Sequence, residues 1–293
     1  MRIMLGILLG IVLTVASAFR CETPRKWQLT SISKHSLASA PMFHCTRSFR
    51  LSAQLTGESA TLETGEMSPP RLAYLALWLG LATYAFTIAP GGSVEAAALD
   101  AEVIKTMITT PFDSANTISP VFTALFNALG VLPAVYASLL LPGTKLQQKV
   151  PGLPFIVSSF ALGFFGIGPY LGLRNRREKV LDSERGRGSI VFEFKGTSLL
   201  LLGFSLYLTY FAATGVYVGT GDRIADFLQL FSTQRLVHVS TIDFTILSLA
   251  MADPLSEDMK RRGWMGPSAP VVCALPVIGP CMYLLLRPSL PKG

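Results

Sequence analysis

Six long apolar stretches dominate this chain and restrict what it can fold into. Each is about 17 to 23 residues long, and short polar joints separate them. A helix of that length is long enough to cross the hydrocarbon core of a bilayer, which is about 30 Å thick. The sequence therefore predicts an all-α fold, a polytopic transmembrane bundle within residues 71–293. The six predicted spans are 72–89, 121–141, 153–173, 196–218, 236–252 and 270–286.

Composition supports the bilayer as the solvent and argues against a nucleic-acid partner. The chain is 50% hydrophobic and only 15% charged, which is too apolar for a typical soluble domain of 293 residues. Its formal charge of +7 comes almost entirely from the first 57 residues, where Lys and Arg greatly outnumber the single acidic residue, Glu22. The predicted membrane domain is therefore close to neutral, and no basic surface for nucleic acid is expected.

The first 18 residues have the three parts of a secretory signal peptide. Arg2 precedes an apolar run from Ile3 to Val15, and the small residues Ala16-Ser17-Ala18 follow. Thirteen apolar-rich residues are too few to span a bilayer comfortably. We expect cleavage after Ala18, which would leave Phe19 as the new N-terminus.

The next segment, residues 19–57, has the composition of a transit peptide. It is rich in Ser, Thr and Arg and poor in acidic residues. A signal peptide joined to a transit peptide at Ala-Ser-Ala-Phe resembles the bipartite plastid-targeting leader of algae with red-derived complex plastids. That resemblance implies a disordered, cleavable leader over 1–57, a linker over 58–70, and a mature protein in a plastid membrane.

Two polar joints are expected to form short helices outside the spans. Val94 to Ile108 is rich in Ala with its charges on one side, which predicts a surface helix. Asp222 to Phe231 is typical of an amphipathic or simple connecting helix. Counts of Lys and Arg place the basic joint 174–195 on the stromal side under the positive-inside rule. With six spans, both chain ends would then lie on the opposite side.

Three residues within predicted spans are the candidate site residues, because ionisable and amide groups are costly in a bilayer. His238 and Asp243 share the fifth span, but five residues of separation turn them about 140° apart on a helix. A proton relay from this pair alone is therefore not expected. For Asp243 the alternatives are a hydrogen bond to a neighbouring helix and a substrate or proton role. For Asn127 they are a contact between helices and a role in chemistry.

Other polar groups favour structural roles. Met251 to Arg262 carries Asp253, Glu257 and Asp258, but their spacing fits no calcium loop, and a solvated loop is expected. Cys273 and Cys281 are eight residues apart in one predicted helix, too far to bridge, so no metal or redox site is expected. Motifs of the common nucleotide-binding, hydrolase and metalloprotease classes are absent from the sequence.

Two further resemblances bear on function. Ser119-Pro120, Phe126-Asn127, Pro133 and Gly168-Pro169-Tyr170 resemble multi-pass proteins of unknown function shared by cyanobacteria and plastids. His238, Asp243, Gly279-Pro280, Tyr283 and Arg287 are similar to the end of neoxanthin-synthase-type plastid membrane proteins, which act in xanthophyll formation. The first implies thylakoid or envelope residence, and the second implies site roles for His238 and Asp243.

Three functions follow as hypotheses. The first is a non-enzymatic membrane protein that contacts the lipid bilayer, and a pigment or photosynthetic complex, and supports assembly or maintenance of that complex. The second is a membrane enzyme of carotenoid or lipid metabolism that uses His238, Asp243 and Asn127. The third is a small-molecule transporter. No particular cofactor is indicated by the sequence.

Overall fold

The computed structural model describes residues 69–145, 150–185 and 188–292, and this part of the chain is helical without strands. The predicted leader, residues 1–57, lies outside the described residues, as does most of the predicted linker. The all-α prediction is confirmed for the described residues. Three helices are long and apolar enough to cross a membrane: Pro120–Thr144, Lys195–Thr214 and Arg235–Arg261. These helices indicate a membrane protein.

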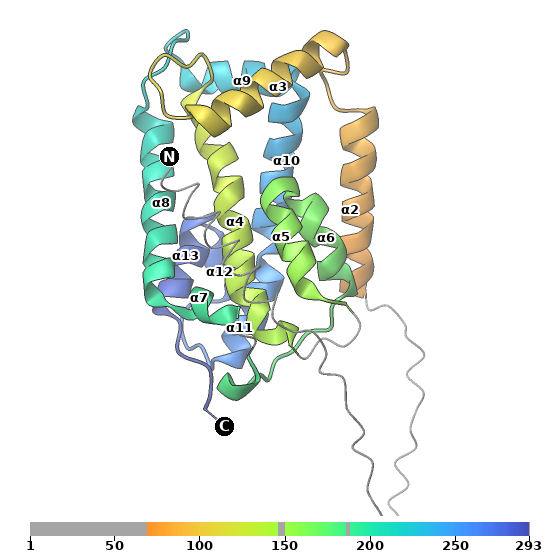
Figure 1. Cartoon of the computed structure of the whole chain (residues 1–293), viewed down its shortest axis with the longest axis vertical. Helices are drawn as coiled ribbons and strands as arrows, with labels where there is room; N and C mark the ends of the chain where they lie inside the picture. The colour runs from red at the N-terminus through yellow and green to blue at the C-terminus, as the bar shows by residue number, and fades with distance from the viewer. Residues whose placement is uncertain (1–68, 146–149, 186–187, 293) are drawn as a thin grey trace, which may run out of the picture.

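Four long elements form the upright part of the bundle (Figure 1). They are α2 (Pro69–Thr87), α4 (Pro120–Thr144), α8 (Lys195–Thr214) and the pair α10 (Arg235–Ala250) and α11 (Ala252–Arg261), which follow one another closely. α4 is central, because it packs against α8, α10, α5 and α11. These elements lie close to four of the predicted spans, with boundaries shifted by a few residues.

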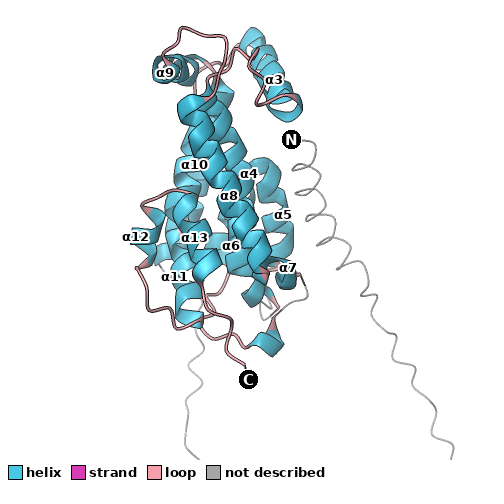
Figure 2. Cartoon of the chain, turned by 90° about the vertical axis from the view of Figure 1, so that its left-hand side faces the viewer, coloured by secondary structure: helices cyan, strands magenta, loops and turns pink. Residues whose placement is uncertain are grey.

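Two short helices lie across one end of the bundle (Figures 1 and 2). They are α3 (Val94–Thr109) and α9 (Arg223–Thr233), so a helix is confirmed in each of the two joints where the sequence predicts one. Ser93 and Asp222 are the N-cap residues of α3 and α9. The Ser93 side chain accepts one backbone N–H of the first turn, and the Asp222 side chain accepts two. Their apolar sides meet the ends of α4 and α10 through Met107, Phe122 and Val237.

The stretch predicted as the third span is two helices rather than one. α5 (Gly152–Leu162) and α6 (Phe164–Leu173) are separated by Gly163, whose φ of +57° ends the first helix. The two helices run antiparallel. Gly152 at the start of α5 lies against Tyr170 near the end of α6, and Gly166 near the start of α6 lies against Ser158 and Ser159 near the end of α5. Each is about 16 Å long, half of what a bilayer core requires.

The stretch predicted as the last span is also broken. α12 (Ala269–Cys273) and α13 (Ile278–Leu286) are joined through Pro276 and Val277, and Val277 has a φ of +63°. The chain before α12 meets α13 and the chain after it, since Trp264 packs edge-on against Tyr283 of α13 and Arg262 donates to the carbonyl of Pro288. Both interrupted segments therefore turn back towards the same end of the bundle. That end also carries α7 (Ser189–Glu193) and the 3-10 turn η1 (Asp182–Glu184).

Because these two segments fold back, the segments that lie at the same end of the bundle differ from those expected for six spans. The backbone of Asp182 donates to the carbonyl of Pro291, and Arg71 donates to Asn175. The start of α2, the joint 174–195 and the C-terminal segment are therefore neighbours at one end (Figure 1). The sequence predicts that the start of the first span and the C-terminal segment lie opposite the joint 174–195. For the described residues this prediction is wrong, because α5 and α6 fold back where one continuous helix was predicted.

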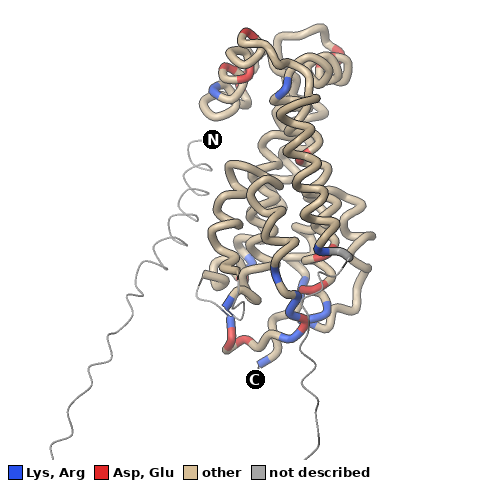
Figure 3. Tube along the Cα trace, turned by 90° about the vertical axis from the view of Figure 1, so that its right-hand side faces the viewer, with Lys and Arg blue, Asp and Glu red and all other residues tan. Residues whose placement is uncertain are grey.

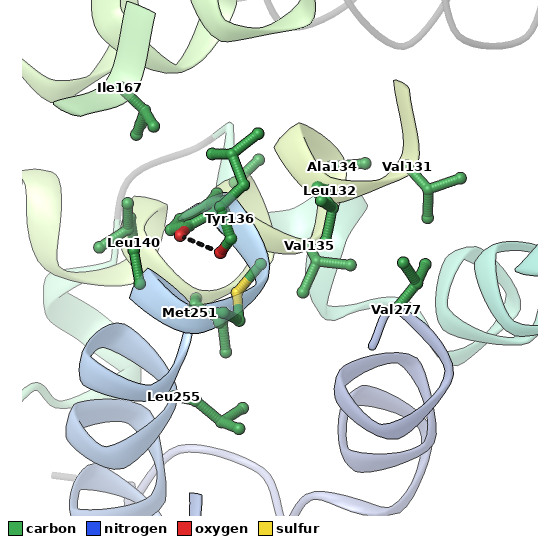
Figure 4. Close-up of a cluster of buried hydrophobic side chains, with 14 of the residues drawn as sticks. Val131, Leu132, Ala134, Val135, Tyr136, Leu140, Ile167, Met251, Leu255 and Val277 are labelled. Carbon is green, nitrogen blue, oxygen red and sulfur yellow. Dashed lines mark hydrogen bonds between the residues drawn. The ribbon is translucent and has the colours of Figure 1, made fainter. Parts of the chain in front are cut away.

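The core lies between α4 and the elements around it (Figure 4). Tyr136 is completely buried and donates its hydroxyl to the carbonyl of Leu247 in α10, at 2.8 Å. Around it lie Leu132, Leu140, Ile167, Met251 and Leu255. In contrast, large apolar side chains of α2 and α8 face outward, as Phe86 (77% exposed) and Tyr210 (66%) show. An apolar exterior of this kind suits lipid contact.

Candidate functional site

Asp243 is buried in α10 and holds the tip of the α5–α6 hairpin. Its carboxylate accepts a hydrogen bond from the backbone N–H of Phe164, at 2.8 Å, which is the first N–H of α6. The side chain lies against Gly163, where an added methyl group would overlap the carboxylate. Glycine is therefore required at this position for contact as well as for backbone conformation. The structure shows Asp243 making the contact between helices that was one of its two expected roles.

His238 joins three elements at the other end of the bundle. One ring nitrogen lies 2.8 Å from the hydroxyl of Tyr84 in α2, and the other lies 2.9 Å from the carbonyl oxygen of Phe231 in α9. The imidazole also stacks on the ring of Phe231, with centroids 4.1 Å apart. Both ring nitrogens are thus engaged with protein groups, and the residue ties α2, α9 and α10 together.

Asn127 makes its hydrogen bond within its own helix. Its amide nitrogen donates to the carbonyl of Thr123 one turn earlier in α4, at 2.8 Å. The three predicted site residues therefore have separate partners on separate elements. The structure does not bring them together, and none of them lines the groove described next.

A groove of about 220 Å³ opens between α8 and α10, with α4 as its floor and the α12–α13 turn at its lower end. Its lining is mostly aliphatic, and the side-chain hydroxyls of Ser205 and Thr209 donate to carbonyls of α8 at 2.7 and 2.9 Å. Neither hydroxyl proton is free to act on a ligand. The lining residues are Val121, Ala124, Leu125, Ala128, Ser205, Leu208, Thr209, Ala212, Phe244, Pro276 and Val277.

A cluster of buried charges lies at the opposite end of the bundle from α3 and α9 (Figure 3). It contains equal numbers of arginines and carboxylates, and we call it the charge cluster. Most members are almost inaccessible, and Glu193 and Asp253 lie at its edge with side chains 14% and 16% exposed. The members are Arg174, Glu193, Asp253, Glu257, Asp258, Arg261, Arg262 and Arg287.

Glu257 is the centre of one half of the charge cluster. It pairs with Arg174, which follows α6, and with Arg261 one turn later in α11. Arg174 also pairs with Asp253 at 3.0 Å, and Arg261 donates to the carbonyl of Leu139 in α4 at 2.9 Å. This half therefore fastens the end of the α5–α6 hairpin to α11 and α4.

Asp258 is the centre of the other half. Its carboxylate accepts from Arg262 and Arg287, each at 2.9 Å, and from the hydroxyl of Tyr283 at 3.0 Å. Arg287 continues to Glu193 and to the carbonyl of Ser138, both at 3.1 Å. This half fastens the end of the α12–α13 segment to α4, α7 and α11.

Electrostatics favour the charged form of two arginines of the charge cluster, Arg174 and Arg262. Burial alone would lower the pKa of Arg174, but Glu257 and Asp253 outweigh it and raise that pKa above its ordinary value. The same balance raises the pKa of Arg262, where Asp258 and Glu193 oppose the effect of burial. In both cases a neighbouring carboxylate, rather than solvent, stabilises the guanidinium.

The prediction of a solvated loop over Met251 to Arg262 is wrong. The stretch is mainly the helix α11, with Met251, Leu255 and Met259 buried along one side. A signal for it was present in the sequence, because Glu257 with Arg261 and Asp258 with Arg262 have the four-residue spacing of helical ion pairs. The distant partners Arg174, Glu193 and Arg287 left no such local signal.

No protein-family model, curated protein or solved structure matches this chain. Function must therefore be argued from the geometry of the described residues.

Proposed function

We propose that the protein is a non-catalytic, multi-pass plastid membrane protein that supports assembly or maintenance of a photosynthetic or pigment- and lipid-containing complex. The main support is that Asp243, His238 and Asn127 each have a protein partner on a different element and that none of them lines the groove. An enzyme site needs reactive groups that converge on a space for substrate. These polar residues instead connect or stabilise helices, as expected of a rigid structural protein.

The proposed membrane topology has four crossings and two half-length hairpins. α2, α4, α8 and α10–α11 cross, while α5–α6 and α12–α13 enter from the same face and return to it. Irregular backbone is tolerated at membrane depth where protein surrounds it, and Asp243 supplies a partner for one such turn. Lys and Arg are concentrated on the face with the charge cluster (Figure 3), so we place that face in the stroma.

The plastid location rests on the leader, whose signal-peptide and transit-peptide parts occur in the required order over residues 1–57. Fusing these residues to a fluorescent protein tests that part of the proposal. We expect import into the plastid, and loss of import when residues 1–18 are deleted. A fusion retained in the secretory pathway would contradict the location.

Native gels of mildly solubilised membranes test the role in assembly. We expect the mature protein to migrate with a larger complex, and we expect that complex to decrease in a knockout. A protein found only as a free monomer, with photosynthetic complexes unchanged in the knockout, would contradict the proposal. A knockout complemented with wild-type sequence is the control for secondary effects.

An Asp243→Asn line separates this proposal from an enzyme of carotenoid or lipid metabolism. The amide oxygen of Asn can still accept from Phe164, so the protein should accumulate and pigment and lipid profiles should stay unchanged. Altered profiles at normal protein levels would favour the enzyme, because the substitution removes an ionisable group while retaining the hydrogen bond.

A transporter is the second candidate, because half-length helices that turn within the membrane occur at the substrate sites of many transporters. Here the two turns lie near adjacent residues of α10, since Asp243 contacts Gly163 and Phe244 lines the groove with Val277. Proton uptake into proteoliposomes, read with an internal pH dye, tests this candidate. We expect no more uptake than in empty vesicles, whereas uptake that Asp243→Asn abolishes would favour a transporter.

A further inference from the structure

We propose that the groove between α8 and α10 is a binding site for one acyl chain of a bilayer lipid. This inference is independent of the role in assembly. Among the described residues, the three helices that are long and apolar enough to cross a membrane all contribute to its lining. With those helices in a bilayer, the open side of the groove faces the hydrocarbon.

The shape of the groove comes from small residues and from the α12–α13 turn. Ala124 and Ala128 on α4 and Ala212 on α8 leave a gap where larger side chains would fill the space. Pro276 and Val277 close its lower end, because α13 begins there instead of continuing upward as a full-length helix. The groove therefore exists because the helix of the last apolar segment is interrupted between α12 and α13.

The volume of the groove and its apolar lining favour a hydrocarbon chain as the ligand. Sites for whole small molecules usually have volumes of about 300 to 1,000 Å³, so about 220 Å³ suits a single chain rather than a complete pigment. Ser205 and Thr209 donate their hydroxyl protons within α8, and the remaining lining side chains are apolar. The lining thus resembles the environment of a hydrocarbon chain, and hydrocarbon is what the surrounding bilayer supplies.

Photocrosslinking in vesicles tests the proposal. The full chain would be reconstituted in phosphatidylcholine vesicles containing a trace of phosphatidylcholine with a diazirine in one acyl chain. After illumination, labelled peptides would be mapped by mass spectrometry. We expect label to concentrate on groove residues of α8, α10 and the α12–α13 turn, and excess unlabelled lipid to compete for it. Uniform label around the outer surface would overturn the proposal.

Neighbouring alanines provide a matched pair of variants. Ala212 lines the groove, whereas Ala213 is exposed and does not. Ala212→Phe should fill the groove and reduce its label at least threefold, while Ala213→Phe should leave it unchanged. If Ala212→Phe fails to fold, Thr209→Trp at the groove edge serves the same purpose. Equal labelling of the filled and control variants would overturn the proposal.

Pigment content distinguishes the acyl chain from an isoprenoid. Protein purified from its own membranes should release fatty-acyl lipid on extraction, in an amount that falls in Ala212→Phe and not in Ala213→Phe. A stoichiometric pigment that Ala212→Phe removes would overturn the acyl-chain assignment, because the groove would then hold part of that pigment.

Discussion

At the residue scale, contact between Asp243 and Gly163 decides how the middle of the chain folds. Gly163 has positive φ and no room for a side chain, while Asp243 accepts the first N–H of α6. An unpaired backbone N–H or carboxylate in a low-dielectric interior costs free energy, and this hydrogen bond gives each group a partner and offsets part of that cost. One carboxylate therefore has a structural reason to lie within a predicted span.

Gly163→Ala should destabilise the protein by about 1 to 3 kcal/mol, because it forces a side chain into positive φ and against Asp243. Thermal unfolding in detergent measures the change. Gly203→Ala in α8 is the control, since a methyl group there meets nothing within 4 Å and alanine favours helix. Equal stability of the two variants would show that the contact with Asp243 has no energetic role.

At the element scale, buried ion pairs hold together segments that are too short to cross a bilayer. The charge cluster fastens the ends of α5–α6 and α12–α13 to α4 and α11 through Arg174 and Arg287. Buried pairs add little net stability over a well-packed apolar core, but loss of one partner leaves an uncompensated charge. The cluster therefore favours one arrangement of these short helices over the alternatives.

Glu257→Gln should cost about 3 to 5 kcal/mol, because Arg174 and Arg261 would lose a buried carboxylate. Glu178→Gln provides a matched comparison. Glu178 pairs with Lys260 at 2.7 Å where both side chains are more than half exposed, and such pairs contribute about 0 to 1 kcal/mol. Denaturation in a graded detergent series would measure the loss of stability in each of the two variants. A small loss for Glu257→Gln would mean that water or another cation replaces the carboxylate.

At the scale of the whole molecule, the two hairpins reverse the expected relation between the chain ends and the joint 174–195. Most of the described basic residues lie at the end of the bundle that carries the C-terminal segment, together with many of the acidic ones (Figure 3). In the proposed topology of four crossings and two returning hairpins, the joint 174–195 lies on the same side as the C-terminal segment, whereas six crossings would place it on the opposite side. Side-specific labelling can therefore distinguish the two topologies.

Single cysteines at Glu184 and Lys292 should react with a membrane-impermeant maleimide from the same side, and a cysteine at Glu102 in α3 should react from the opposite side. Cys21, Cys45 and Cys273 would be replaced by alanine beforehand, while Cys281 is fully buried. Labelling of sealed and opened vesicles gives the readout. Six crossings would instead place Glu184 and Lys292 on opposite sides.

Local information in the sequence determined where most helices lie. Length and apolarity located α2, α4, α8 and α10, and charge patterning located α3 and α9, because these signals act between residues a few positions apart. The same reasoning identified Asp243 as a costly residue needing a partner.

Tertiary structure decided the rest. The sequence predicts continuous spans over 153–173 and 270–286, because sequence cannot show that Asp243 or α4 is available to stabilise a turn at Gly163 or Pro276. Arg287 lies 29 residues from Asp258 and 94 from Glu193, so no local pattern predicts their pairing. Folding brings these charges together because each loses water as the short helices pack, and an ionised partner then becomes the least costly replacement.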